Sequence, residues 1–471
     1  TGRLVVKKSF EKAGLRFIST RPVYLVRLPR AGECGKTEHI LFSGTPHASH
    51  TFHPCRGSPL DAAFSGLSRD IPADFAERLR TATFIAFRRL LDLCERESPD
   101  FLLLAGDVYN QEDASVSAQL ALRDGFRRLE SLSIPVFLVH GNHDPLASRL
   151  RSVRWPGNVT VFGELPDAVP VFRKGEGTPL AIIHGASHAS GRETRNLAAL
   201  FRRTEACGLH VGLLHATPGD ADGVARYAPF SQEDLKASGM DYWALGHIHD
   251  RREVCREPLA AYPGCTQGLH INEPGEKGCL LVTAEARPDG GYAVRTSFRP
   301  LGPAVWKTLD MDLGGAASLD ELENRLRTGL DRAAAEVWSG CEMLLVRLRL
   351  QGRTELDGLL RKGTTCAELA DRLREDGSGV PRIWIKDIDV ATRPCVERGA
   401  LLEREDLLGE VFRLSEAART ASGLQALREG PLAPLFAHAR AGKALEPLTD
   451  EELARLLDDA ESLCLDLLEN D

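Results

Sequence analysis

The sequence lacks any long uninterrupted run of apolar residues. No stretch approaches the roughly 18 apolar residues that a helix needs to cross a bilayer. The opening residues 1–8 also lack the apolar centre and the cleavage site of an export signal. Hydrophobic residues make up 43% of the chain and charged residues 27%, which is typical of a globular protein. We therefore expect a protein without a membrane segment.

Paired cysteine motifs are absent as well. The 11 cysteines are scattered along 471 residues, are odd in number and include no C-x-x-C pair. This pattern is typical of reduced, mostly buried thiols rather than of a disulfide framework. It favours a cytoplasmic location.

An excess of positive charge is also missing, because the net charge is −8. A protein coated in basic surface is thereby excluded, and any nucleic-acid site would be a local basic patch beside metal ions. The length of 471 residues predicts two or three domains.

The pattern of apolar and polar residues divides the chain into four regions. Residues 1–40 show no clear period and are left unassigned as an N-terminal extension. Residues 41–300 contain helical stretches that alternate with short apolar runs, which indicates a layered α/β domain. Residues 301–397 are predicted to form a small α/β accessory or capping domain, and residues 398–471 form a helical C-terminal region.

Five apolar runs in the α/β domain each lead into polar residues. In layered α/β folds, groups at the carboxyl ends of strands gather along one edge of the sheet. The spacing along the chain therefore predicts proximity in space. The five runs are 101–105 before Gly106-Asp107, 136–139 before the segment 140–144, 180–183 before His184, 211–214 before His215, and 242–245 before the segment 246–249.

These polar residues suit phosphodiester hydrolysis by two metals, which stand about 4 Å apart in such sites. Manganese, iron and zinc accept mixed nitrogen and oxygen ligands. We expect Asp107 to bridge the two ions, and Asn142, His215 and His247 to bind one of them. His249 would bind the other ion, because residues two apart in an extended segment point to one side.

The neighbours of Asn142 have a separate predicted role. His143 is interpreted as the acid that protonates the departing sugar oxygen, since the pKa of imidazole lies near neutrality. Asp144 would orient it.

In this order, GD at 106–107, GNHD at 141–144, LLH at 213–215 and GHIH at 246–249 resemble the calcineurin-like metallophosphoesterase superfamily. Within it, residues 241–251 and 262–278 are similar to the SbcD-type DNA-repair exonucleases of the YhaO-like branch. The resemblance covers roughly residues 57–300. It implies a four-layer sandwich of two mixed sheets flanked by helices, with the capping domain and helical tail behind it.

The same resemblance implies a function in outline. We expect a metal-dependent exonuclease or endonuclease that acts on DNA in repair through a hydroxide activated by two Mn²⁺ ions. DNA, an SbcC-like coiled-coil ATPase and a second copy of the chain are the expected partners. Asn110, three residues after Asp107, and His270 are candidate substrate contacts.

The first motif of this superfamily is an Asp-x-His, and here the sequence departs from it. If its histidine is His53, Thr51 stands where the aspartate belongs. Threonine is a poor ligand for a divalent ion, so the first metal site is predicted to be weakened. Two alternatives follow: a catalytically weakened subunit that binds DNA or the ATPase, and a phosphoesterase of the same fold that acts on nucleotides or phosphoproteins.

Overall fold

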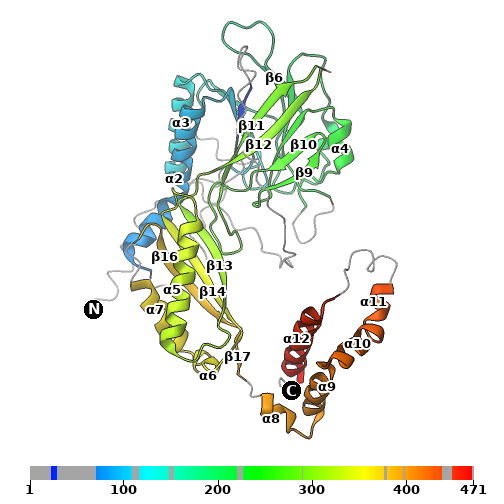
Figure 1. Cartoon of the computed structure of the whole chain (residues 1–471). Helices are drawn as coiled ribbons and strands as arrows, with labels where there is room; N and C mark the ends of the chain where they lie inside the picture. The colour runs from blue at the N-terminus through cyan, green and yellow to red at the C-terminus, as the bar shows by residue number, and fades with distance from the viewer. Residues whose placement is uncertain are drawn as a thin grey trace, which may run out of the picture. The chain divides into compact units, whose positions relative to one another are not determined.

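The computed structural model describes residues 23–28, 71–108, 116–147, 153–219, 226–288, 290–375, 379–395, 398–437 and 448–468. The chain forms two compact units (Figure 1). Unit 1 comprises Thr1–Asp312, Leu322–Leu350 and Lys362–Val390. Unit 2 comprises Leu313–Glu321, Gln351–Arg361 and Ala391–Asp471.

The first large sheet of unit 1, sheet A, is mixed. Its central strand β1 runs antiparallel to β2 and parallel to β11, while β2, β3 and β4 are parallel to one another and β12 closes the sheet antiparallel to β11. In spatial order, the strands are β12 (Tyr292–Pro300), β11 (Gly278–Ala286), β1 (Val23–Arg27), β2 (Phe101–Ala105), β3 (Val136–Val139) and β4 (Val159–Val161).

The second large sheet, sheet B, is also mixed. Strands β6, β7, β8 and β10 are parallel, and the antiparallel strands β5 and β9 flank them. In spatial order, the strands are β5 (Asp167–Val171), β6 (Ala181–Ala186), β7 (Leu209–His215), β8 (Tyr242–Gly246), β10 (Leu259–Tyr262) and β9 (Arg252–Arg256).

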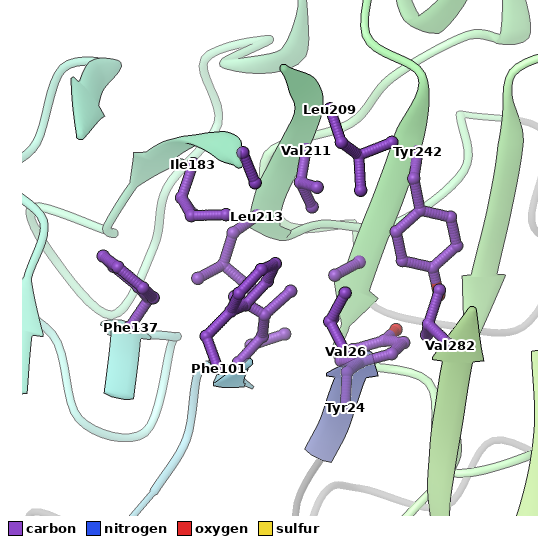
Figure 2. Packing of buried hydrophobic residues seen from close by; sticks show 14 of the residues in the cluster. Tyr24, Val26, Phe101, Phe137, Ile183, Leu209, Val211, Leu213, Tyr242 and Val282 are labelled. Atoms are coloured by element: carbon purple, nitrogen blue, oxygen red, sulfur yellow. The ribbon is translucent and has the colours of Figure 1, made fainter. Parts of the chain in front are cut away.

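The two sheets pack face to face over a single apolar core. Phe101, Val211 and Tyr242 are among the side chains that meet there, from strands of both sheets (Figure 2). The hydroxyl of Tyr24, on β1, reaches across the core and accepts a hydrogen bond from the amide of Leu245 at 2.8 Å. A buried hydroxyl needs such a partner, so this contact holds β1 of sheet A against β8 of sheet B.

Helices cover the outer faces of both sheets. On sheet A, Leu102 and Leu104 turn away from the inter-sheet core and pack with α2 (Ala73–Glu97) and α3 (Val116–Ser131). On sheet B, Trp243 packs with the short 3-10 helix η1 (Ala198–Leu200) and with α4 (Gln232–Ala237). Strand β2 is a continuous apolar run because both of its faces are buried. These layers confirm the predicted four-layer sandwich.

A smaller sheet completes unit 1. Its order is β13 (Ala304–Asp312), β14 (Met343–Gln351) and β16 (Arg382–Val390), with β14 and β16 parallel. The accompanying helices are α5 (Leu319–Glu336) and α7 (Thr365–Glu375). Trp306 of β13 and Trp384 of β16 join Phe75 of α2 in one buried cluster. The accessory sheet therefore shares a core with helix α2, which covers sheet A.

Unit 2 is mainly helical. Leu401, Leu408, Phe412 and Leu465 form its small apolar core. Its elements are the parallel pair β15 (Arg353–Thr354) and β17 (Arg393–Pro394), and the helices α6 (Asp357–Leu360), α8 (Arg398–Leu402), α9 (Leu407–Ala418), α10 (Ala421–Glu429), α11 (Ala433–Ala437) and α12 (Asp450–Leu468).

The structure departs from the sequence predictions in two places. The sequence shows no clear period over residues 1–40, yet β1 lies in the middle of sheet A. The third apolar run was expected to end before His184, but β6 continues to Ala186 and buries His184 within the sheet. The other domain boundaries stay predictions.

Among the described helices, none has the length and apolar character that crossing a membrane requires.

Candidate metal centre

The turn after β2 places the carboxylate of Asp107 at the edge of sheet A. Gly106 and Asp107 have φ angles of 87° and 54°, a region in which a non-glycine residue is strained. A Cβ atom on Gly106 would lie 2.5 Å from Nδ1 of His215, so glycine is required there. Asp107 is fully buried. A buried carboxylate needs hydrogen bonds or a cation around it.

The loop after β3 is tied to this turn through the buried carboxylate of Asp144. That carboxylate accepts hydrogen bonds from the amides of Asp107 at 3.0 Å, Val108 at 2.8 Å and Gly141 at 2.7 Å. The bonds from Asp107 and Val108 fix the two loops against each other, and the bond from Gly141 closes the loop after β3. The predicted role of Asp144 in orienting His143 stays a prediction.

His143 is placed beside the candidate ligand Asp107 by its backbone. Its amide donates a hydrogen bond of 2.7 Å to Oδ1 of Asp107. The half-buried imidazole is therefore carried by a residue whose main chain is bound to the central carboxylate. The function of the imidazole as an acid stays a prediction.

His215 ends β7 and presents one particular nitrogen to the site. Its Nδ1–H donates to the carbonyl oxygen of Ala105 at 2.9 Å, so Nε2 of the neutral ring carries the lone pair. Nε2 lies 3.1 Å from Oδ2 of Asp107 and 2.9 Å from Oδ1 of Asn142. A lone pair surrounded by two oxygens is repulsive unless a proton or a cation lies among them. This arrangement fits a metal ion.

His247 follows β8 and has a strained backbone conformation. Its φ is 106°, which costs a non-glycine residue of order 1–3 kcal/mol. A Cβ atom on the preceding Gly246 would lie 1.7 Å from the carbonyl oxygen of Ala105, so that position excludes every other residue. The His247 ring lies 5.2 Å from the ring of His215 and 5.2 Å from that of Tyr227.

Four of the predicted ligands converge. Ligand atoms of Asp107, His215 and His247 all lie within 4.8 Å of one another, and Oδ1 of Asn142 stands beside Nε2 of His215. Two imidazoles, one carboxylate and one amide oxygen form a mixed donor set that suits a borderline divalent ion. Within the described ranges this is the one such cluster of histidine, cysteine and acidic residues. The donors therefore fit the ion that the sequence predicts.

His249 lies outside this cluster. Its Nδ1–H donates to Oε1 of Glu273 at 2.5 Å. Burial alone would raise the pKa of Glu273, but the hydrogen bond and charge of His249, with the amide of Leu269, lower it to about 2. No motif in the sequence marks Glu273. It stands 24 residues after His249, and only the loop that follows β10 brings the two together.

Of the remaining predicted residues, only His270 lies among the described ones. His270 is half-buried, and its Nδ1 accepts a hydrogen bond from the amide of Asn272 at 3.1 Å. Asn110 and His53 lie outside the described residues. Their predicted roles stay predictions.

A further histidine, His188, supports the site from behind. It is fully buried and its Nε2–H donates to the carbonyl oxygen of His215 at 2.6 Å. Burial, together with the neighbouring His215, lowers the pKa of His188 to about 4. A neutral His188 therefore holds the backbone of the candidate ligand His215. No motif in the sequence marks this role.

Comparison with known families gives two matches. The calcineurin-like phosphoesterase model matches residues 53–251, which include every ligand of the cluster. The model of the middle domain of metallophosphoesterase YhaO matches residues 306–393. The second match covers most of the accessory sheet.

Individual relatives agree with these matches. An uncharacterized metallophosphoesterase YhaO of Bacillus subtilis (strain 168) is 33% identical over 378 residues, which cover 79% of this chain and 88% of that protein. The DNA double-strand break repair protein Mre11 of Aeropyrum pernix is 26% identical over 289 residues, covering 55% of this chain and 64% of that protein. Its counterpart in Haloferax volcanii is 24% identical over 355 residues, covering 71% and 72%.

The fold, the donor set and these matches agree on a phosphoesterase, a hydrolase whose fold implies divalent metal ions. The chain belongs to the calcineurin-like metallophosphoesterase family, in its YhaO branch.

Proposed function

We propose that this chain is a metal-dependent nuclease that hydrolyses phosphodiester bonds of DNA in repair. The observation that carries the proposal is the convergence of Asp107, His215 and His247 within 4.8 Å, each from the end of a different strand. A phosphodiesterase needs to neutralise charge on the phosphoryl oxygens and to activate water at neutral pH. Divalent ions bound by these donors would supply both.

The ligands divide into two proposed sets. One ion would be held by a set of four residues, because their donor atoms already lie close together. These residues are Asp107, Asn142, His215 and His247. Asp107 would also serve the other ion, together with His249 and with His53 of the first motif. Manganese suits both sets, because it accepts imidazole nitrogen as well as carboxylate and amide oxygen.

His143 would act on the leaving group. Its amide is bound to Oδ1 of Asp107, so its imidazole is carried next to the ligands without being one of the clustered donors. An imidazole near its ordinary pKa can donate a proton to the departing sugar oxygen. Asn110 and His270 are the proposed contacts to the rest of the DNA.

DNA is the proposed substrate because two relatives that span more than half of this chain are named as DNA double-strand break repair proteins. An SbcC-like coiled-coil ATPase and a second copy of the chain are the proposed partners, and the cytoplasm is the proposed location.

Cleavage assays with two kinds of substrate test this function. The manganese-loaded chain and its Asp107→Asn variant would be given a duplex oligonucleotide and bis(p-nitrophenyl) phosphate. We expect the unmodified chain to cleave the duplex in the presence of manganese and the variant to lose both activities. Hydrolysis of the small diester, nucleotides or a phosphopeptide without any cleavage of duplex or single-stranded DNA would contradict the proposal.

A second candidate function rests on one observation, the threonine at position 51 where the first motif requires aspartate. In this reading the chain is a weakened subunit that binds DNA or the ATPase with one occupied metal site. Tight DNA binding without manganese-dependent cleavage would favour it over the nuclease.

A further inference from the structure

The loop between β10 and β11, residues 263–277, packs against the backbone of His249. Gly264 has a φ of 79°, and a Cβ atom there would lie 2.7 Å from the carbonyl oxygen of His249. The same carbonyl accepts a hydrogen bond from the amide of Cys265 at 3.3 Å. We call residues 263–277 the carboxylate loop, because they carry Glu273. Their start is thus fixed directly beside His249.

Within the carboxylate loop, both oxygens of Glu273 have defined partners. Oε1 lies 2.5 Å from Nδ1 of His249, and Oε2 accepts the amide of Leu269 at 2.8 Å. The amide of Glu273 itself donates to the carbonyl oxygen of His270 at 2.8 Å. The loop therefore folds back on itself and directs one carboxylate oxygen at a single ring nitrogen.

The contact with Glu273 determines the tautomer of His249. An ionised carboxylate only accepts hydrogen bonds, so the proton of the neutral imidazole lies on Nδ1. The lone pair then lies on Nε2. A histidine that binds a metal needs one nitrogen without a proton, and a carboxylate on the opposite nitrogen selects it.

The accessory sheet anchors the carboxylate loop from the other side. Nε1–H of Trp306, on β13, donates to the carbonyl oxygen of Gly268 at 3.1 Å, and the amide of Gly275 donates to the carbonyl oxygen of Trp306 at 2.8 Å. Ile271 packs in the same buried cluster as Trp306. Bonds on both sides of Glu273 therefore tie the loop to β13.

We propose that Glu273 is a positioning residue that holds the Nδ1–H of His249 and so reserves Nε2 of that histidine for the metal. The carboxylate loop delivers Glu273, and β13 of the accessory sheet fixes the loop. This inference rests on the proposed role of His249 as a metal ligand.

Replacement of Glu273 by glutamine gives a sharp test because the backbone amide of Leu269 still needs a hydrogen-bond acceptor. The amide oxygen of glutamine would turn to the Leu269 amide, and its NH₂ group would face Nδ1 of His249. Nδ1 would then have to accept, which moves the proton to Nε2 and blocks metal binding. Glu276→Gln is the matched control, since Glu276 lies in the same loop and its carboxylate accepts the amide of Trp338 at 2.9 Å instead.

Two measurements on the full chain read out this effect. Nitrogen-15 NMR of histidine-labelled, metal-free protein reports the tautomer of His249, assigned by comparison with His249→Ala. Titration with Mn²⁺ alone, with free Mn²⁺ followed by electron paramagnetic resonance, reports the affinity of each site. Loss of a carboxylate that supports a metal-binding histidine typically lowers metal affinity by about 10–100-fold.

We expect Glu273→Gln to move the proton of His249 to Nε2 and to weaken the weaker manganese site by about 10–100-fold. The tighter ion, held through His215 and His247, should remain, which also shows that the variant is folded. Glu276→Gln should match the unmodified chain in both measurements.

An unchanged tautomer or an unchanged affinity of the weaker site in folded Glu273→Gln would overturn the inference. The proposed ligand set is tested separately. If His249→Ala keeps the full affinity of both sites, the assignment of His249 as a ligand is wrong. If His249→Ala loses affinity and Glu273→Gln does not, only the role of Glu273 is wrong.

Discussion

The amide of Asp107 donates a hydrogen bond of 3.0 Å to the buried carboxylate of Asp144, 37 residues further along the chain. This bond joins the loop after β2 to the loop after β3. It therefore connects the candidate metal-bridging residue to the segment that carries Asn142 and His143. The geometry of the site depends on the fit between these two loops.

Asp144→Asn is expected to destabilise the fold and to weaken metal binding. The substitution keeps the shape of the side chain but turns one acceptor oxygen into an NH₂ group that faces backbone amides. A buried donor left without an acceptor costs about 1–3 kcal/mol. Urea denaturation measures the change in unfolding free energy, and Asp124→Asn on the exposed face of α3 serves as the control. Equal stability of the two variants would contradict this role of Asp144.

His143→Ala is expected to abolish cleavage while metal content stays nearly unchanged. The substitution removes an acid but leaves the amide that binds Asp107. Removal of a general acid typically lowers the rate by about 10²–10⁴-fold. Elemental analysis and cleavage of a duplex oligonucleotide are measured on the same sample. Loss of an ion in this variant would show that His143 is a ligand.

The buried pair His184 and His210 predicts a dependence of stability on pH. Nε2 of His184 lies 2.9 Å from Nδ1 of His210. Burial, followed by the charges of His210 and Arg203, lowers the pKa of His184 to about 4, and burial also lowers that of His210. The neutral forms are favoured in the folded state, whereas the unfolded chain takes up protons near pH 6.5.

The free energy of unfolding should therefore fall as the pH drops from about 6.5 towards 4. His184→Gln removes one of the two titrating imidazoles and should therefore weaken the dependence of the unfolding free energy on pH. Urea denaturation at a series of pH values measures this dependence. The control is His270→Gln, at a half-buried position outside this pair. An identical pH profile for His184→Gln and the unmodified chain would show that His184 does not cause the effect.

Thr51→Asp is expected to raise both manganese stoichiometry and DNA cleavage. The proposed first site would use His249 and share Asp107, but the sequence offers no aspartate two residues before His53. A site without its own carboxylate has less neutralising charge for a divalent ion. Thr51→Asn, which adds a neutral oxygen ligand, is the matched control and should restore less. No gain in bound manganese with Thr51→Asp would mean that another residue completes the first site.

Much of the fold could be predicted from the sequence. The apolar runs of β2, β3, β7 and β8 are continuous because each strand is buried on both faces, and glycine or a chemically active side chain marks the end of each run. These four strands carry the clustered ligands. Strands β2 and β3 are parallel neighbours in sheet A, and β7 and β8 are parallel neighbours in sheet B, so each pair presents its carboxyl ends at the same edge of its own sheet.

Other features could not be predicted from the local sequence pattern. Strand β1 has only five residues, and its burial comes from partners about 80 and 255 residues away. His184 was expected at a strand end, but pairing with β7 extends β6 past it. Glu273 carries no signal of its own, because its role depends on a loop that returns to His249. Each of these depends on long-range contacts.

The manganese content of His247→Ala tests the central claim most directly. His247 is the candidate ligand with the strained backbone, and it lies in one cluster with Asp107 and His215. Equilibrium dialysis followed by elemental analysis would count the ions bound by the unmodified chain, by His247→Ala and by the control His270→Ala, whose ring lies outside the cluster. The account predicts one tightly held ion in the unmodified chain and in His270→Ala, and its loss in His247→Ala. A folded His247→Ala variant that keeps this ion would contradict it.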